Sequence, residues 1–161
     1  MRLLRTRRLS RKAGSDVPEH VAELFSRFYD ALNDRNLPAI EELLREVEDD
    51  GTGPRKVGGF RTSTGRSAIM LELRTWLNSW AAYRAEPTGV TSVGDRFVVS
   101  TTTVTRPLGS SIDLRGEAAD IFVLERGRIE SLRLRVNRSA VLRELGLLDA
   151  EPGAGRGRIG R

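Results

Sequence analysis

Hydrophobic residues recur every three or four positions in the first part of the chain, and this spacing predicts helices. The first helix is expected between Asp16 and Asn33, with an apolar face formed by Val21, Leu24, Phe25, Phe28 and Leu32. Asp16 is expected to cap it, with Pro18 in the first turn. A second helix is expected to follow directly, capped by Asn36 and burying Ile40, Leu43 and Leu44.

The next segment, residues 47–66, is irregular and rich in Gly, Asp, Thr and Arg. It predicts a short strand around Val47, a loop and an extended stretch near Phe60. Helical spacing returns at Ser67 and predicts a third helix. The positions on or near its buried face are Ile69, Met70, Leu73, Trp76, Leu77 and Trp80.

After Trp80 the pattern changes to the two-residue period of strands, which predicts strands at 82–93, 96–106, 111–124 and 128–136. Gly94-Asp95 and Arg126-Gly127 supply tight turns, so these strands should form an antiparallel meander. A short helix should close the domain between Ser139 and Leu148. The predicted fold class is α+β, a cone-shaped curved antiparallel sheet packed against three helices from the N-terminal half. Such a cone leaves room for a ligand in its mouth.

Charge divides the chain into a domain and two basic ends. The predicted domain is 16–148, between a basic N-terminal arm, 1–15, and a tail, 149–161. The net charge is +5, but residues 1–12 and the last residues of the tail hold so many basic side chains that residues 13–155 are slightly acidic. A basic arm can bind nucleic acid or an acidic partner. A solvated, disordered terminus is the commoner outcome and is preferred here.

Several kinds of chemistry are excluded by composition. The chain has no cysteine and a single histidine, His20, so disulfides, thiolate catalysis, Cys-bound zinc and multi-histidine metal sites are ruled out. No metal or other cofactor is expected. No apolar run approaches the roughly 18 residues of a membrane span, and the basic arm lacks the apolar core of a secretory signal, so a cytoplasmic location is expected.

Three stretches carry a resemblance to a known family: VAELFSRFYDALNDRNLPAIEELL, GRSAIMLELRTWLNSW, and VGDRFVV followed by RGEAADIFVLERGRIESLRLRVNRSAVL. In this order they resemble the SnoaL-like branch of the nuclear transport factor 2-like superfamily, which includes polyketide cyclases and ketosteroid isomerases. The resemblance spans roughly residues 17–148. It implies a cone-shaped α+β barrel with an apolar pocket between helices and sheet, and a homodimer packed sheet to sheet.

The resemblance also suggests positions for an isomerase-type site. Asp49 matches the position of a catalytic base, and Asp120 lies close to that of a buried acid. The tyrosine that donates to the substrate oxygen would fall at Phe28, while Tyr29 is rotated by about 100° on the helix and should face elsewhere. The isomerase arrangement is therefore expected to be incomplete.

Asp120 is the most informative single residue, because strand alternation places it on an apolar face with Leu114, Gly116, Ala118, Phe122 and Leu124. A carboxylate there must be paired, hydrogen-bonded or protonated. It could be a pocket acid, or a structural group held by Arg133, Arg135, Arg61 or a backbone N–H. The proposed pocket wall, which could equally be plain core, comprises Phe25, Phe28, Tyr29, Trp76, Trp80, Leu114, Ala118, Phe122 and Arg133.

Three functional readings remain. The favoured one is a SnoaL-like pocket protein that binds a small apolar molecule and forms a homodimer through its sheet. The second is a cyclase or isomerase-type enzyme without metal, using Asp120 and Asp49 as acid–base groups. The third is an interaction module whose basic arms contact nucleic acid or an acidic partner, although binding of nucleic acid is not expected.

Overall fold

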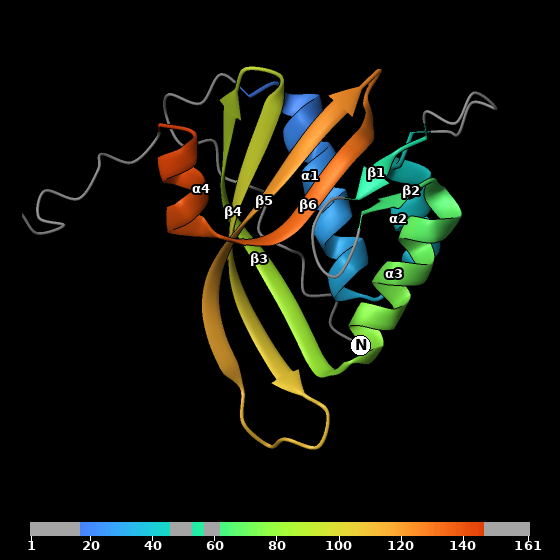
Figure 1. Ribbon diagram of the computed structural model, residues 1–161, viewed down its shortest axis with the longest axis vertical. Helices are drawn as coiled ribbons and strands as arrows, with labels where there is room; N and C mark the ends of the chain where they lie inside the picture. Colours follow the sequence, from blue (N-terminus) through green and yellow to red (C-terminus); the bar gives the residue numbers. More distant parts are fainter. Residues whose placement is uncertain (1–16, 46–52, 57–61, 147–161) are drawn as a thin grey trace, which may run out of the picture.

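This computed structural model describes residues 17–45, 53–56 and 62–146 of the chain. These residues contain four helices and six strands. Figure 1 shows their arrangement. In chain order the elements are α1 (Glu19–Asn33), α2 (Leu37–Leu43), β1 (Arg55–Lys56), β2 (Ser63–Thr64), α3 (Arg66–Asn78), β3 (Trp80–Val93), β4 (Arg96–Pro107), β5 (Leu114–Glu125), β6 (Arg128–Asn137) and α4 (Arg138–Glu144). None of these helices is long and apolar enough to cross a bilayer.

The starts of the helices follow from local capping. Asn36 caps α2 as predicted, because its Oδ1 accepts a hydrogen bond from the backbone N–H of Ala39 at 3.2 Å. Gly65 precedes α3 with φ at +93°, a conformation that side chains disfavour. The prediction that Asp16 caps α1 is wrong: Pro18 occupies the N-cap, and no side chain caps that end.

The six strands form one curved, open sheet in the order β2-β1-β6-β5-β4-β3. β3 to β6 are paired antiparallel through short turns, as the alternating pattern predicts. The expectation of a wholly antiparallel sheet is corrected at β1, which pairs parallel to β6 with Lys56 opposite Leu132. The sequence positions around Val47 and Phe60, where extended segments were expected, lie outside the described residues.

Helices cover both faces of this sheet. The inner face is the one toward α1, α2 and α3, and it carries the main core, with Val99, Phe122 and Leu132 fully buried. The outer face carries Val98, Ala119 and Ile121, which pack with Val141 of α4 in a smaller second core. Figure 1 shows α4 on the opposite side of the sheet from the other helices.

One side chain fixes the end of α1 against the edge of the sheet. Asn33 donates from Nδ2 to the carbonyl of Ala85 at 2.9 Å, and its Oδ1 accepts from the N–H of Ala85 at 2.8 Å. Because β3 is an edge strand, this amide satisfies backbone groups that have no neighbouring strand to pair with. The clamp also fixes α1, and therefore Tyr29, over the inner face.

Candidate functional site

A hydrogen bond between Tyr29 and Asp120 is the main polar feature between α1 and the inner face. The Tyr29 hydroxyl donates to Oδ2 of Asp120 at 2.5 Å. Tyr29 on α1 is fully buried and Asp120 on β5 is 3% exposed. A charge-assisted hydrogen bond of this kind is the usual way to keep a carboxylate in an apolar interior.

The surroundings perturb the phenol strongly. Burial raises the pKa of Tyr29 well above its usual value, and the negative charge and hydrogen bond of Asp120 raise it further. Tyr83 on β3 adds to this rise in pKa. Tyr29 is therefore a proton donor across the whole physiological pH range, and Asp120 is the acceptor.

The prediction that Tyr29 faces away from the site is wrong. The buried side of α1 includes both Phe28 and Tyr29, because the helix lies deep in the curve of the sheet and buries an arc wider than one narrow stripe. A rotation of about 100° therefore moves Tyr29 around the buried arc without bringing it into solvent.

Aromatic rings surround the pair. Phe122 of β5 contacts Phe25 and Phe28, with ring centroids 4.7 and 5.2 Å apart, and Phe25 also meets Phe97 at 5.8 Å. Phe28 and Tyr29 themselves lie edge to face at 5.2 Å. Four predicted wall residues, Phe25, Phe28, Tyr29 and Phe122, are thus brought together with Asp120.

The other predicted wall residues are more scattered. Trp76 packs edge to face on Tyr83 with centroids 4.6 Å apart, and Trp80 lies partly buried beside the same core. Ala118 is buried two positions from Asp120 on the inner face, whereas Leu114 is 52% exposed. That these residues line a ligand pocket stays a prediction.

Arg133 lies on the other side of the sheet. Its register partner is Ile121, whose side chain belongs to the outer core, and paired strand residues project to the same face. Arg133 therefore lies away from Asp120. This differs from both expectations for Arg133, that it lines the pocket and that it pairs with the Asp120 carboxylate. Arg61, the side chain of Arg135 and the proposed base Asp49 lie outside the described residues and side chains.

Sequence reasoning missed several inner-face polar residues. Thr101, Thr103 and Thr105 of β4 are all buried on the inner face, and Thr101 donates to the carbonyl of Ala118 at 3.4 Å. Their alternation with outward residues was visible in the sequence, but threonine alone does not separate a buried from a solvated strand face. Lys56, Ser63 and Glu72 form a second buried polar cluster, described below.

A hollow of about 440 Å³ lies elsewhere, on β4 and β5, lined by Thr102, Thr103, Val104, Arg115, Gly116 and Glu117. Four of these residues project from the outer face, so this hollow is separate from the Tyr29–Asp120 pair. Within residues 17–45, 53–56 and 62–146, no group of three or more His, Asp or Glu side chains is arranged to hold a metal ion.

Solved structures share this fold. The chain is 18% identical to TerC, co-crystallised with polyporic acid, over 76% of this chain and 95% of TerC, with a TM-score of 0.60. It is 21% identical to a proposed polyketide cyclase from Sinorhizobium meliloti, over 73% and 94% of the two chains, with a TM-score of 0.57. A nuclear transport factor 2-like protein of unknown function from Burkholderia pseudomallei is 17% identical over 80% and 98%, with a TM-score of 0.62.

Sequence comparison assigns the family. A search of curated proteins finds no significant match. The family model for the SnoaL-like domain matches residues 25–132, a segment that begins within α1, ends within β6 and includes both Tyr29 and Asp120. Because the match covers well over half of the sequence and the fold agrees with it, the chain belongs to the SnoaL-like family, with a nuclear transport factor 2-like fold.

Proposed function

We propose that this SnoaL-like protein binds a small, largely apolar molecule on the inner face of its sheet, with Asp120 as the polar contact. The observation that carries the proposal is the buried hydrogen bond from Tyr29 to Asp120 among aromatic rings. Small-molecule sites are mostly apolar walls with a few placed polar groups, and this pair has that character.

Asp120 has the capacity to bind a ligand hydroxyl beside Tyr29. A carboxylate can accept several hydrogen bonds at once, and the Tyr29 hydroxyl donates to Oδ2 of Asp120. A phenol, enol or alcohol is therefore the expected polar group of the ligand. The TerC structure with polyporic acid supports the idea that this fold accommodates a small organic molecule.

The test compares two probes that differ in one donor, 2-naphthol and 2-methoxynaphthalene, by titration calorimetry. The wild-type protein should prefer 2-naphthol, and Asp120→Asn should reduce that preference by roughly tenfold, the scale of a hydrogen bond to a charged group. Asp113→Asn, an exposed carboxylate paired with Arg106, is the matched control and should leave it unchanged. Binding of neither probe to the wild type, or an unchanged preference in Asp120→Asn, would rule the proposal out.

A second candidate function is proton transfer of the cyclase or isomerase type, with Asp120 as the acid–base group. It is favoured by the placement of a proton donor, Tyr29, and a proton acceptor, Asp120, side by side in a buried site. In this reading Asp120 removes a proton from carbon next to a carbonyl group and returns it elsewhere, and the Tyr29 hydroxyl stabilises the charge on Asp120.

The measurement for this second reading is deuterium exchange at the α-carbons of 2-tetralone in D₂O, followed by NMR. The wild type should accelerate exchange over buffer, and Asp120→Asn should lower the catalysed rate about 100-fold or more, as expected for loss of a general base. If the wild type gives the buffer rate, or Asp120→Asn keeps the full rate, Asp120 is not the base for such a ketone.

The proposal includes a homodimer formed through the outer face. α4 covers this face at Val98, Ala119 and Ile121, so the dimer would use the part near Val104, Arg115 and Glu117. Arg115 and Glu117 lie two positions apart on one strand face. A two-fold axis passing between them would place Arg115 of each protomer opposite Glu117 of the other.

A further inference from the structure

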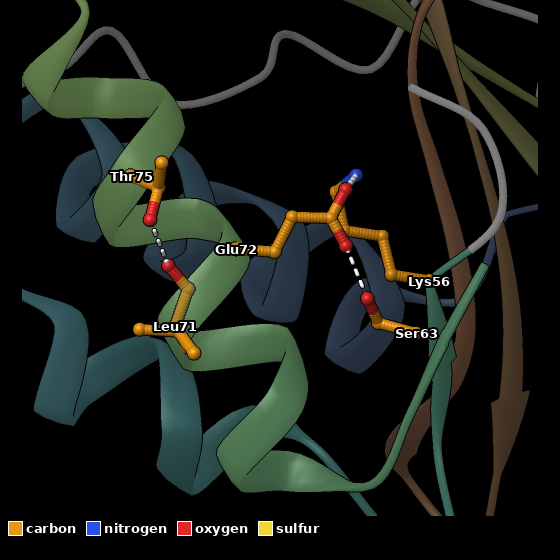
Figure 2. Close-up of polar contacts among 5 residues, drawn as sticks. All are labelled: Lys56, Ser63, Leu71, Glu72 and Thr75. Atoms are coloured by element: carbon orange, nitrogen blue, oxygen red, sulfur yellow. Dashed lines mark hydrogen bonds and ion pairs between the residues drawn. The ribbon is translucent and has the colours of Figure 1, made fainter. Parts of the chain in front are cut away.

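Lys56, Ser63 and Glu72 form a buried polar cluster at the β1–β2 end of the sheet. Lys56 Nζ lies 2.6 Å from Oε1 of Glu72, and the Ser63 hydroxyl donates to the other carboxylate oxygen, Oε2. Lys56 is 7% exposed, Ser63 5%, and the Glu72 side chain 19%. Figure 2 shows the two strand residues reaching toward Glu72 on α3.

The strand register places Lys56 on the inner face. Lys56 is paired with Leu132 of β6, and Leu132 with Phe122 of β5; both apolar partners are fully buried in the main core. Because directly opposed strand residues project to the same face, the lysine side chain enters the same side of the sheet as Asp120. Both polar groups therefore project from the inner face of the sheet.

The separation of the two polar groups suits a small molecule. β1 and β5 are separated only by β6, and Asp120 lies two residues from the row of Lys56, Leu132 and Phe122. Strand spacing and rise put the Cα atoms of Lys56 and Asp120 about 12 Å apart. The apolar side chains between them, Leu132 and Phe122, are fully buried in the main core, so the inner face runs from cation through apolar residues to carboxylate.

Burial of this lysine is not explained by stability alone. A buried ion pair contributes little compared with well-packed apolar residues of similar volume. Glu72 engages Lys56 through one oxygen and Ser63 through the other, so the ammonium is held in a fixed position. A charge fixed beforehand on a mostly apolar surface is the arrangement that favours ligand binding.

We infer that Lys56 is a second ligand contact, which binds a carboxylate or carbonyl oxygen at the end of the ligand remote from Asp120. This inference rests on the proposed function and adds a ligand class: a flat apolar skeleton with a hydroxyl at one end and an anionic or carbonyl oxygen at the other. Glu72 and Ser63 are positioning residues that hold the ammonium in place.

The test is titration calorimetry of the full chain with 6-hydroxy-2-naphthoate and with 2-naphthol, which lacks the carboxylate. The wild type should bind the naphthoate roughly tenfold to hundredfold more tightly, as one hydrogen bond to a charged group provides. Lys56→Met should abolish this preference and leave 2-naphthol binding unchanged. Arg55→Met removes the same charge from the exposed neighbouring position and should keep the preference.

Two further variants separate ligand contact from a purely structural brace, and decide the matter if Lys56→Met does not fold. Lys56→Arg should retain the preference, and Glu72→Gln should increase it, because the ligand carboxylate then no longer competes with Glu72 for the ammonium. A brace would give lower thermal stability in Glu72→Gln with no gain in preference, which overturns the inference. Equal binding of both probes to the wild type also overturns it, whereas failure of 2-naphthol itself to bind contradicts the proposed function.

Discussion

Tyr29 is the residue whose chemistry departs furthest from that of a free side chain. Its hydroxyl is completely buried and donates to Asp120 at 2.5 Å, so deprotonation would place a second negative charge beside the first. This explains why the pKa of Tyr29 is raised from its usual value of 10.0. The hydrogen bond from Tyr29 in turn stabilises the carboxylate of Asp120 in an apolar interior.

The raised phenol pKa has a consequence for stability at alkaline pH. A group whose pKa is higher in the folded state stabilises the protein fully below its unfolded pKa, here about 10, and loses this contribution as the pH rises toward the folded value. Urea unfolding of the wild type should therefore show a free energy of unfolding that falls above about pH 10. Tyr29→Phe should lack this part of the decline.

The same variant has a cost at neutral pH, where it leaves Asp120 without the Tyr29 donor. Tyr29→Phe should lower the free energy of unfolding by about 1–3 kcal/mol at pH 7, the penalty for removing one partner of a buried polar group. Arg27, an exposed residue on the same helix, offers a control substitution to alanine that should change little. A wild-type pH profile that is flat up to pH 11 would contradict the burial argument.

At the scale of elements, local signals predicted what local physics determines. Asn36, Gly94-Asp95 and Arg126-Gly127 mark a cap and two hairpin turns that depend on neighbouring residues alone, and each is confirmed. β1 was not predicted because the strand is only two residues long, Arg55 and Lys56. Its parallel partners in β6 lie more than seventy positions further along the chain. No periodicity exists in so short a segment.

The candidate site was predictable only in part for a similar reason. Asp120 was identified because a carboxylate in an alternating apolar strand is anomalous in the sequence itself. Its partner Tyr29 was misplaced because the width of the buried arc of a helix depends on how deeply the helix packs. Lys56, Ser63 and Glu72 meet only through tertiary structure, and nothing in their spacing distinguishes them from surface residues.

For the whole molecule, the two faces of the sheet would give the proposed ligand site and the proposed dimer interface separate surfaces. The inner face holds both polar contacts proposed for the ligand, Asp120 and Lys56. The outer face is covered by α4 over one part and carries charged residues over another. Assembly through the uncovered part would leave the inner face unobstructed, so binding and dimerisation should be independent in this protein.

The homodimer can be tested through its charges. If Arg115 of each protomer faces Glu117 of the other, Arg115→Glu places like charges across the interface and should weaken dimerisation by roughly tenfold or more in sedimentation equilibrium. Adding Glu117→Arg should restore dimerisation in part, because within one chain Glu117 also lies 3.4 Å from Arg138 of α4. Glu23, an exposed carboxylate of α1 and therefore away from the outer face, provides the control when changed to Gln. A monomeric wild type would contradict the proposed homodimer, and a dimer insensitive to both changes would place the interface elsewhere. Binding of 2-naphthol should be the same in every variant, because none of the changes touches the inner face.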